Sequence, residues 1–136
     1  MGRCFADTYF WLALIRERDA DHRRAVECWG KLGAGEVITT AWVLVELADG
    51  MSRQGSRGVC ARFVEDLRNE RTVRVIEPDV SLLWRGFDLY RDRADKEWSL
   101  TDCISFVVMA DEGLTQALTG DRHFEQAGFV ALLSGA

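Results

Sequence analysis

Four acidic side chains stand beside apolar segments of the sequence, in an order that could bring them together. They are Asp7, Glu46, Asp102 and Asp121. Four carboxylate ligands, with no convergent histidine or cysteine, suit a hard cation such as Mg²⁺ or Mn²⁺. Such an ion lowers the pKa of a bound water and neutralises charge on a leaving oxygen. The chemistry that we expect from this set is therefore hydrolysis of a phosphodiester.

Each acid also has a simpler structural interpretation. Asp102 lies three residues after Ser99 in the segment SLTDCISFVVMA, the spacing of a helix capping box. Asp7 and Asp121 could be N-cap or turn residues. Glu46 is harder to explain in this way, because residues 41–48 are otherwise apolar. A partly buried carboxylate there needs either an arginine or a metal ion opposite it.

The elements that must position these acids alternate between strands and helices. We expect strands at residues 3–6, 37–39, 73–76, 115–119 and 129–132, and helices at 9–15, 19–32, 41–50, 57–69, 78–94, 99–110 and 122–126. This order predicts an α/β three-layer sandwich, with a central, mainly parallel sheet of about five strands flanked by helices. Ligands of such sheets bind beyond the carboxyl ends of the strands, where Asp7 and Asp121 would lie.

Composition narrows the class of protein. A chain of 136 residues, 48% of them apolar, predicts a single domain over residues 1–136. It has neither an apolar run long enough for a membrane span nor the apolar region of a signal peptide, so we expect it in the cytoplasm. The four cysteines are scattered and His22 and His123 are far apart in the chain, which predicts free thiols and no zinc site.

The net charge of −5 argues against a protein that coats nucleic acid through a uniformly basic surface. Arginines nevertheless concentrate between residues 53 and 74 and between 85 and 93. They could form a local strip that contacts phosphates, or a solvated helix surface with pairs such as Arg62 and Asp66. The helix of residues 78–94 is predicted to bury an apolar stripe that consists of Val80, Leu83, Trp84, Phe87 and Tyr90.

The acidic residues and their flanks resemble the PIN domain family, most closely the VapC-type toxin ribonucleases. The likeness consists of Asp7-Thr8 after the first strand, Glu46 on the third helix, SLTDCISF around Asp102 and ALTGDRHF around Asp121, and it extends to the ending EQAGFVALL. It implies an endoribonuclease dependent on Mg²⁺ or Mn²⁺, with the four acids as catalytic and metal-binding residues. Asp121 matches the family's most variable acid. The hydroxyls of Thr8, Ser105 and Thr119 match positions that support the ligands.

The resemblance also implies partners: an RNA substrate and an antitoxin protein. The helices that contain Trp11 and Trp29 could leave an apolar patch exposed, which predicts a homodimer or an antitoxin complex. One alternative is a PIN-like module that binds RNA or protein without cleavage. Another is a receiver-like signalling module, which would need a second acid beside Asp7 and a late lysine, but no lysine follows Lys96.

Overall fold

A single parallel sheet forms the centre of the molecule. The computed structural model describes residues 2–134, and its five strands are arranged in the order β3-β2-β1-β4-β5. The strands are β1 (Cys4–Ala6), β2 (Val37–Thr40), β3 (Val73–Ile76), β4 (Gln116–Leu118) and β5 (Val130–Ala131). The helices are α1 (Thr8–Ile15), α2 (His22–Lys31), α3 (Ala41–Gly50), α4 (Gln54–Asn69), α5 (Val80–Asp92), α6 (Leu100–Glu112) and α7 (Arg122–Gln126).

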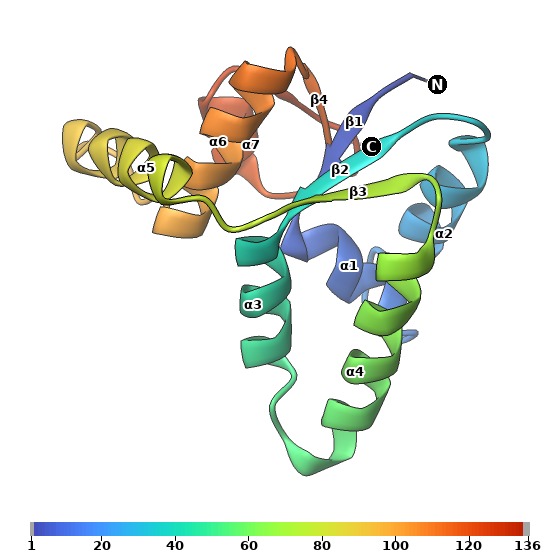
Figure 1. Ribbon diagram of the computed structural model, residues 1–136. Helices are drawn as coiled ribbons and strands as arrows, with labels where there is room; N and C mark the ends of the chain where they lie inside the picture. The colour runs from blue at the N-terminus through green and yellow to red at the C-terminus, as the bar shows by residue number, and fades with distance from the viewer. Residues whose placement is uncertain (1, 135–136) are drawn as a thin grey trace.

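The chain crosses between strands in two opposite directions, and this places helices on both faces of the sheet. All four strand pairs are parallel, and Phe5 of β1 is paired with Ile38 on one side and with Ala117 on the other. The chain moves outward from β1 to β3 through α1–α4, then returns past β1 to β4 and β5 through α5–α7. Right-handed crossovers therefore put these two groups of helices on opposite faces (Figure 1). The predicted α/β sandwich is confirmed.

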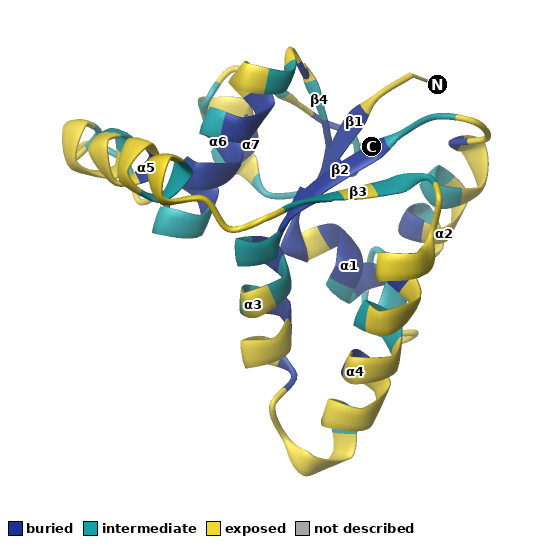
Figure 2. Cartoon of the chain, in the orientation of Figure 1, coloured by how far each residue is buried: buried dark blue, intermediate teal, exposed yellow. Residues whose placement is uncertain are grey.

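The core is densest at the central strands. All three residues of β1 and all four of β2 are buried (Figure 2). Strands covered by helices on both faces need such continuous apolar or hydrogen-bonded runs. Trp11 of α1 is fully buried and makes edge contacts with Trp29 and Phe63, so it is not part of an exposed patch as its helix had suggested. All four cysteines are free, and three are buried.

Helix α5 is oriented differently from the prediction. Of the expected buried stripe only Leu83 packs against the core, whereas Val80 is 73% exposed, Trp84 57%, Phe87 39% and Tyr90 49%. The buried side of α5 instead centres on Gly86, which meets Ile104 of α6. The helix has two apolar sides, and periodicity alone could not tell which one faces the core. Val26 of α2 and Val59 of α4 are also apolar and exposed, at 48% and 54%.

Within residues 2–134, no helix is both long enough and apolar enough to cross a membrane.

The close contact of α5 with α6 generates a first prediction. A Cβ atom at Gly86 would overlap the Ile104 side chain and lie 3.1 Å from its Cα and 3.2 Å from its backbone nitrogen. Gly86→Ala should therefore lower the free energy of unfolding by about 1–3 kcal/mol, because backbone cannot move aside as a flexible side chain can.

Gly58→Ala is the matched control, because Gly58 lies within α4 with no atom near its Cβ position. It should raise the free energy of unfolding by about 0.5–1 kcal/mol. Urea titrations of both variants measure the difference. Equal stability of the two variants would show that the α5–α6 contact is loose.

Candidate metal centre

The site lies at the carboxyl ends of the two central strands. Asp7 directly follows β1, and Asp121 comes three residues after the end of β4. The strands are neighbours, and the Asp7 amide donates a hydrogen bond of 3.3 Å to the carbonyl of Leu118. From β1 the chain continues to β2 and β3 on one side of the sheet, whereas from β4 it continues to β5 on the other side. The direction in which strands are added therefore reverses between β1 and β4. This is the crevice in which open α/β sheets bind ligands.

Thr119 connects the two strand ends. Its hydroxyl donates a hydrogen bond of 3.2 Å to Asp7 Oδ2 and accepts one of 3.0 Å from the Asp121 amide. The side chain has no solvent exposure. Thr119 therefore holds the Asp7 carboxylate and also fixes the start of the turn that carries Asp121.

Asp7 is buried without full hydrogen bonding. Only 4% of the residue is exposed, and Oδ1 is the buried side-chain polar atom without a partner in the described part of the chain. Asp7 precedes α1, but its side chain makes no capping hydrogen bond. The N-cap interpretation does not explain this carboxylate. A buried oxygen left unpaired is costly, and a bound cation would satisfy it.

Asp102 is both a cap and a member of the cluster. Ser99 Oγ accepts from the Asp102 amide at 3.0 Å, and Asp102 Oδ2 accepts from the Ser99 amide at 3.1 Å, which completes the predicted capping box. The residue is only 6% exposed and faces His123. Asp121 likewise caps α7 by accepting from the His123 amide at 2.9 Å. The cap interpretation is therefore correct for these two acids, but it describes only part of their surroundings.

Glu46 points from α3 toward α1. Its Oε1 accepts a hydrogen bond of 2.5 Å from the Thr8 hydroxyl. Among residues 2–134, the ion pairs include none between Glu46 and a lysine or arginine, so the arginine considered as its partner is not there. Thr8 and Thr119 thus contact acids as expected. Ser105 does not, because its hydroxyl donates to the carbonyl of Thr101 one turn earlier.

The four acids lie close enough to perturb one another. Burial raises the pKa of Asp7 to about 8, with further contributions from the charges of Asp102, Glu46 and Asp121. Burial, and then the charges of Asp102 and Asp121, also raise the pKa of Glu46. The pKa of Asp102 is raised by burial and by Asp121. The fold therefore assembles negative charge that favours binding of a cation.

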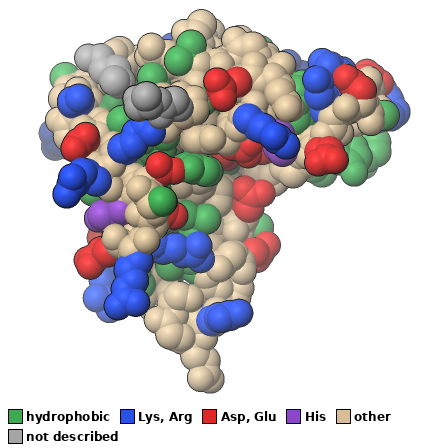
Figure 3. Space-filling model, turned by 180° about the vertical axis from the view of Figure 1, so that it is seen from behind, with side chains coloured by type: hydrophobic (Ala, Val, Ile, Leu, Met, Phe, Trp, Pro, Cys, Tyr) green, Lys and Arg blue, Asp and Glu red, His purple; other side chains and the backbone are tan. Residues whose placement is uncertain are grey.

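A histidine outside the predicted set of four acids stands beside them. His123 Nδ1 is 3.0 Å from Asp102 Oδ2 and 3.4 Å from Asp121 Oδ1. Figure 3 shows acidic side chains near the middle of one face with a histidine beside them. The distance of His123 from His22 in the sequence argues against a site with two histidines, but not against one histidine beside acids. The useful signal was its position two residues after Asp121, since a short helix brings that residue back over its cap.

The two groups of arginines in the sequence differ in how their charge is balanced. Arg74 pairs with Glu36 and Glu112, and Arg85 pairs with Asp111. Arg91 and Arg93 also pair with aspartates near them in the sequence. The pair of Arg62 with Asp66 is not among the ion pairs of residues 2–134. The positive charge at residues 74–93 is thus balanced by nearby acids, whereas the ion pairs of residues 2–134 include none of the five arginines between residues 53 and 71.

The donor set fits a divalent ion. It offers carboxylate oxygens from three aspartates and one glutamate, together with one imidazole. One of these oxygens, Asp7 Oδ1, is buried and has no hydrogen-bond partner among the described residues. Ligand atoms of Asp102, Asp121 and His123 lie within 4.8 Å of one another. Hard divalent cations prefer such oxygen-rich sites.

Comparison with known proteins gives a consistent result. The model of the PIN domain family matches residues 4–130. The 23S rRNA-specific endonuclease VapC20 of Mycobacterium tuberculosis is 30% identical over 131 residues, which cover 93% of this chain and 95% of that protein.

Solved structures agree with this match. The crystal structure of Mycobacterium tuberculosis VapC20, described as a sarcin-ricin loop cleaving toxin, superposes with a TM-score of 0.85 at 29% identity, covering 93% of this chain and 96% of that one. VapBC2 from Rickettsia felis, bound to a fragment of promoter DNA, gives 0.67 at 12% identity and 95% and 96% coverage. FitAcB from Neisseria gonorrhoeae gives 0.67 at 19%, with 94% of each chain covered. The last two show the fold alone.

The crowding of charge around Asp7 predicts how stability changes with pH in the absence of metal. The folded pKa of about 8 lies above the ordinary value of 3.8, so between these pH values the folded state retains a proton that the unfolded state releases. Stability should therefore fall as pH rises from about 4 to 8, by at most about 1.4 kcal/mol per pH unit. Asp7→Asn should flatten this dependence and melt above wild type at pH 8 in EDTA.

Asp49→Asn serves as the control, because Asp49 is an exposed acid of α3. Its melting profile should follow wild type at every pH. Thermal melts from pH 4 to 8 measure the effect, and a wild-type profile for Asp7→Asn would mean that Asp7 carries no excess electrostatic strain.

Proposed function

The chain belongs to the PIN domain family, and we propose that it is a metal-dependent endoribonuclease, the toxin of a toxin–antitoxin pair, working in the cytoplasm as a single domain over residues 1–136. The observation that carries this proposal is the buried, unpaired oxygen of Asp7 among three further acids that raise its pKa. In a purely structural role, nothing would compensate the cost of burying an unpaired carboxylate oxygen among other acids.

Asp7, Glu46, Asp102 and Asp121 hold Mg²⁺ or Mn²⁺ in this proposal. When bound, the ion supplies a positive centre that activates water and stabilises charge on the phosphate being cleaved. Thr119 keeps Asp7 Oδ2 engaged, which leaves Oδ1 for the ion, and Thr8 holds Glu46 toward the same centre. The two strand ends and the first turn of α6 are rigid, so the ligands are positioned before substrate arrives.

The substrate is RNA. A relative with 30% identity across nearly the whole of both chains is named a 23S rRNA-specific endonuclease, and its structure is described as that of a sarcin-ricin loop cleaving toxin. We therefore place ribosomal RNA first among substrates to test. A PIN-like module that binds RNA or protein without cleavage is the alternative, and the complete set of four acids argues against it.

Cleavage of 23S rRNA in purified ribosomes tests the proposal. Wild type should cut only with Mg²⁺ or Mn²⁺, and EDTA should stop it. Because ribosomes themselves need Mg²⁺, naked rRNA and a short single-stranded RNA should be assayed in parallel. Asp102→Asn should lower the rate by about 100-fold or more, since Asn caps a helix about as well but removes an anionic ligand.

Melting curves separate the metal role of Asp102 from its cap. In EDTA Asp102→Asn should melt above wild type, and added Mn²⁺ should stabilise it much less. Melting points equal to wild type in both conditions, with cleavage intact, would reduce Asp102 to a helix cap. Cleavage that persists in EDTA, absent from a parallel Asp7→Asn preparation, would refute metal dependence.

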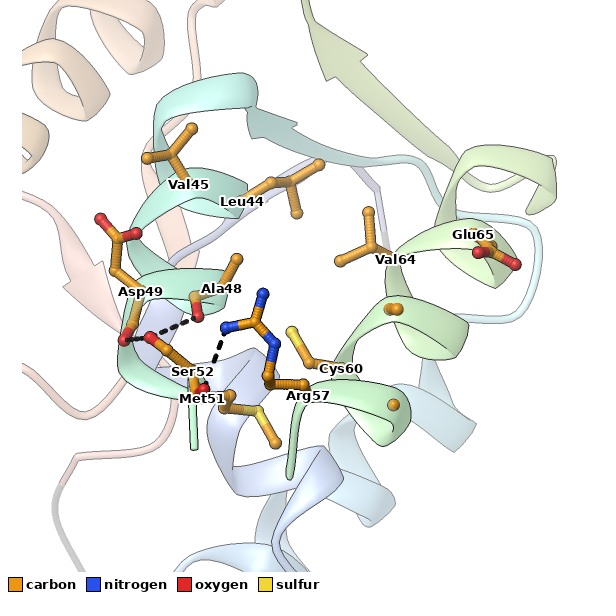
Figure 4. Close-up of a pocket in the computed structure, with 12 residues that line it drawn as sticks. Leu44, Val45, Ala48, Asp49, Met51, Ser52, Arg57, Cys60, Val64 and Glu65 are labelled. Carbon is orange, nitrogen blue, oxygen red and sulfur yellow. Dashed lines mark hydrogen bonds between the residues drawn. The ribbon is translucent and has the colours of Figure 1, made fainter. Parts of the chain in front are cut away.

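An antitoxin partner is supported by the description of the VapC20 structure as a toxin and by a groove between α3 and α4 of this chain. The groove has a volume of about 740 Å³, with Leu44, Ala48, Met51 and Val64 on its walls, and Arg57 projects between the two helices (Figure 4). Apolar walls with a guanidinium between them suit an amphipathic protein segment. A neighbouring small open reading frame that encodes a DNA-binding protein would identify the antitoxin.

A homodimer is proposed through α5 instead of through the helices of Trp11 and Trp29. Trp84, Phe87 and Tyr90 form a continuous exposed row, with ring centroids 5.8 and 6.0 Å apart. Together with Val80 they expose roughly 450 Å² of side chain, about half of what each partner contributes to a standard interface. Figure 3 shows hydrophobic side chains at the end of the molecule where α5 projects.

The charges around this aromatic row favour a second copy over RNA. Residues 77–97 contain six acids and four basic residues, an unfavourable balance for a phosphate backbone. Arg91 and its partners Asp88 and Asp92 are all more than half exposed on the same helix. In a two-fold pair the arginine of one copy can meet the acids of the other.

Light scattering after size exclusion tests the dimer. Wild type should have twice the chain mass of 15.4 kDa, and the double variant Trp84→Glu/Phe87→Glu should be monomeric. Val59→Glu, which alters an exposed apolar residue of α4, should remain dimeric. A wild-type monomer at high concentration, or a dimer that survives the double change, would exclude α5 as the interface.

A further inference from the structure

His123 lies where a fifth metal ligand would be expected. Its Nδ1 atom faces Asp102 Oδ2 at 3.0 Å and Asp121 Oδ1 at 3.4 Å. The side chain is 23% exposed, so the imidazole lines the site at its edge and remains reachable from solvent. The other histidine, His22, is different, because its Nδ1 lies 2.7 Å from the carbonyl of Ala13 on a neighbouring helix.

We propose that His123 Nδ1 is a direct ligand of the catalytic ion, together with Asp102 and Asp121, and that this nitrogen makes the site prefer a first-row transition ion such as Mn²⁺ over Mg²⁺. This inference rests on the proposed function. It adds a ligand outside the set of four acids and assigns a metal preference.

The distances suit an octahedral ion. With ligands about 2.1 Å from the metal, adjacent ligand atoms are separated by about 3.0 Å. The distance from Nδ1 to Asp102 Oδ2 has this value, and that to Asp121 Oδ1 is 0.4 Å longer. One ligand atom from each of the three residues lies within 4.8 Å of the other two, so one ion can contact all three once their side chains adjust. Each carboxylate oxygen has two lone pairs, so it can keep its capping hydrogen bond while it binds the ion.

The surrounding structure fixes the imidazole near the acids. The next residue, Phe124, is fully buried and packs against Phe106 and Phe5. The His123 amide donates to Asp121 Oδ1, which holds the turn closed from the other side. These contacts fix the backbone of His123 at a point from which its imidazole reaches Asp102 and Asp121.

The donor chemistry gives the metal preference. Mg²⁺ takes oxygen ligands almost exclusively and keeps several waters, whereas imidazole nitrogen binds transition ions more readily. A site made only of the four acids would show little reason to distinguish Mg²⁺ from Mn²⁺. Binding through Nδ1 requires the ring proton to be on Nε2, the tautomer in which Nδ1 offers a lone pair.

Electron spin echo spectroscopy of bound Mn²⁺ detects a coordinated imidazole directly. Labelling with ¹⁵N-histidine changes the coupling frequencies only if the nitrogen that binds Mn²⁺ belongs to a histidine. The chain has two histidines, so variants of each identify which one it is. Wild type and His22→Gln should show this coupling, and His123→Asn and His123→Gln should lack it. Asn is the informative variant, because its amide occupies nearly the position of Nδ1 and can still hydrogen-bond to the acids.

Metal titrations without RNA give the second measurement. His123→Asn should weaken Mn²⁺ binding by about 10- to 100-fold and Mg²⁺ binding much less, so the preference for Mn²⁺ should collapse. Circular dichroism spectra that match wild type would establish that the variant is folded. If Asn preserves both affinities, His123 only orients the acids and the inference is wrong.

The outcomes distinguish this inference from the proposed function. Wild type that binds Mn²⁺ with no imidazole coupling overturns the ligand role of His123 and leaves a metal site made of acids. Coupling that is lost in His22→Gln instead also overturns it. Wild type that binds neither Mn²⁺ nor Mg²⁺ defeats the proposed metal-dependent function, and this inference with it.

Discussion

Repulsion among carboxylates at one end of the sheet is the constraint on which the rest of the structure depends. Asp7, Glu46, Asp102 and Asp121 come from four different elements, and burial and mutual charge raise the pKa of the three that are most enclosed. An isolated group of this kind would separate or take up protons. Here the parallel strands and the helix that starts beside them hold the acids in place, and the free energy of the core offsets the unfavourable charge.

Local hydrogen bonds decide how each acid is turned. Thr119 and Thr8 donate to Asp7 and Glu46, so each of these acids has one oxygen engaged by a neighbouring hydroxyl. Asp102 and Asp121 accept backbone bonds at the starts of α6 and α7. The same two residues then face His123. Capping and ligand chemistry are compatible here because a carboxylate has more lone pairs than a helix cap uses.

The two surfaces proposed to bind partners belong to helices that are connected to the site, although they face other directions. Glu46 and the groove residues Leu44 and Ala48 belong to the same helix, α3. On the opposite side of the sheet, the aromatic row of α5 is attached to α6, which carries Asp102, through the contact of Gly86 with Ile104. A displacement of either helix by a bound protein would therefore reach an acid of the site.

The sequence by itself determined the α/β order and the parallel sheet, because alternating apolar segments restrict topology. It also predicted four acids at one edge of the sheet, which remain the proposed metal ligands. It also identified Thr8 and Thr119, although not the direction of Ser105. Tertiary structure alone decided which side of α5 is buried, because two apolar sides have the same period and only packing at Gly86 selects between them. It also decided that His123 joins the site, since that contact depends on the turn that carries the histidine back toward α6.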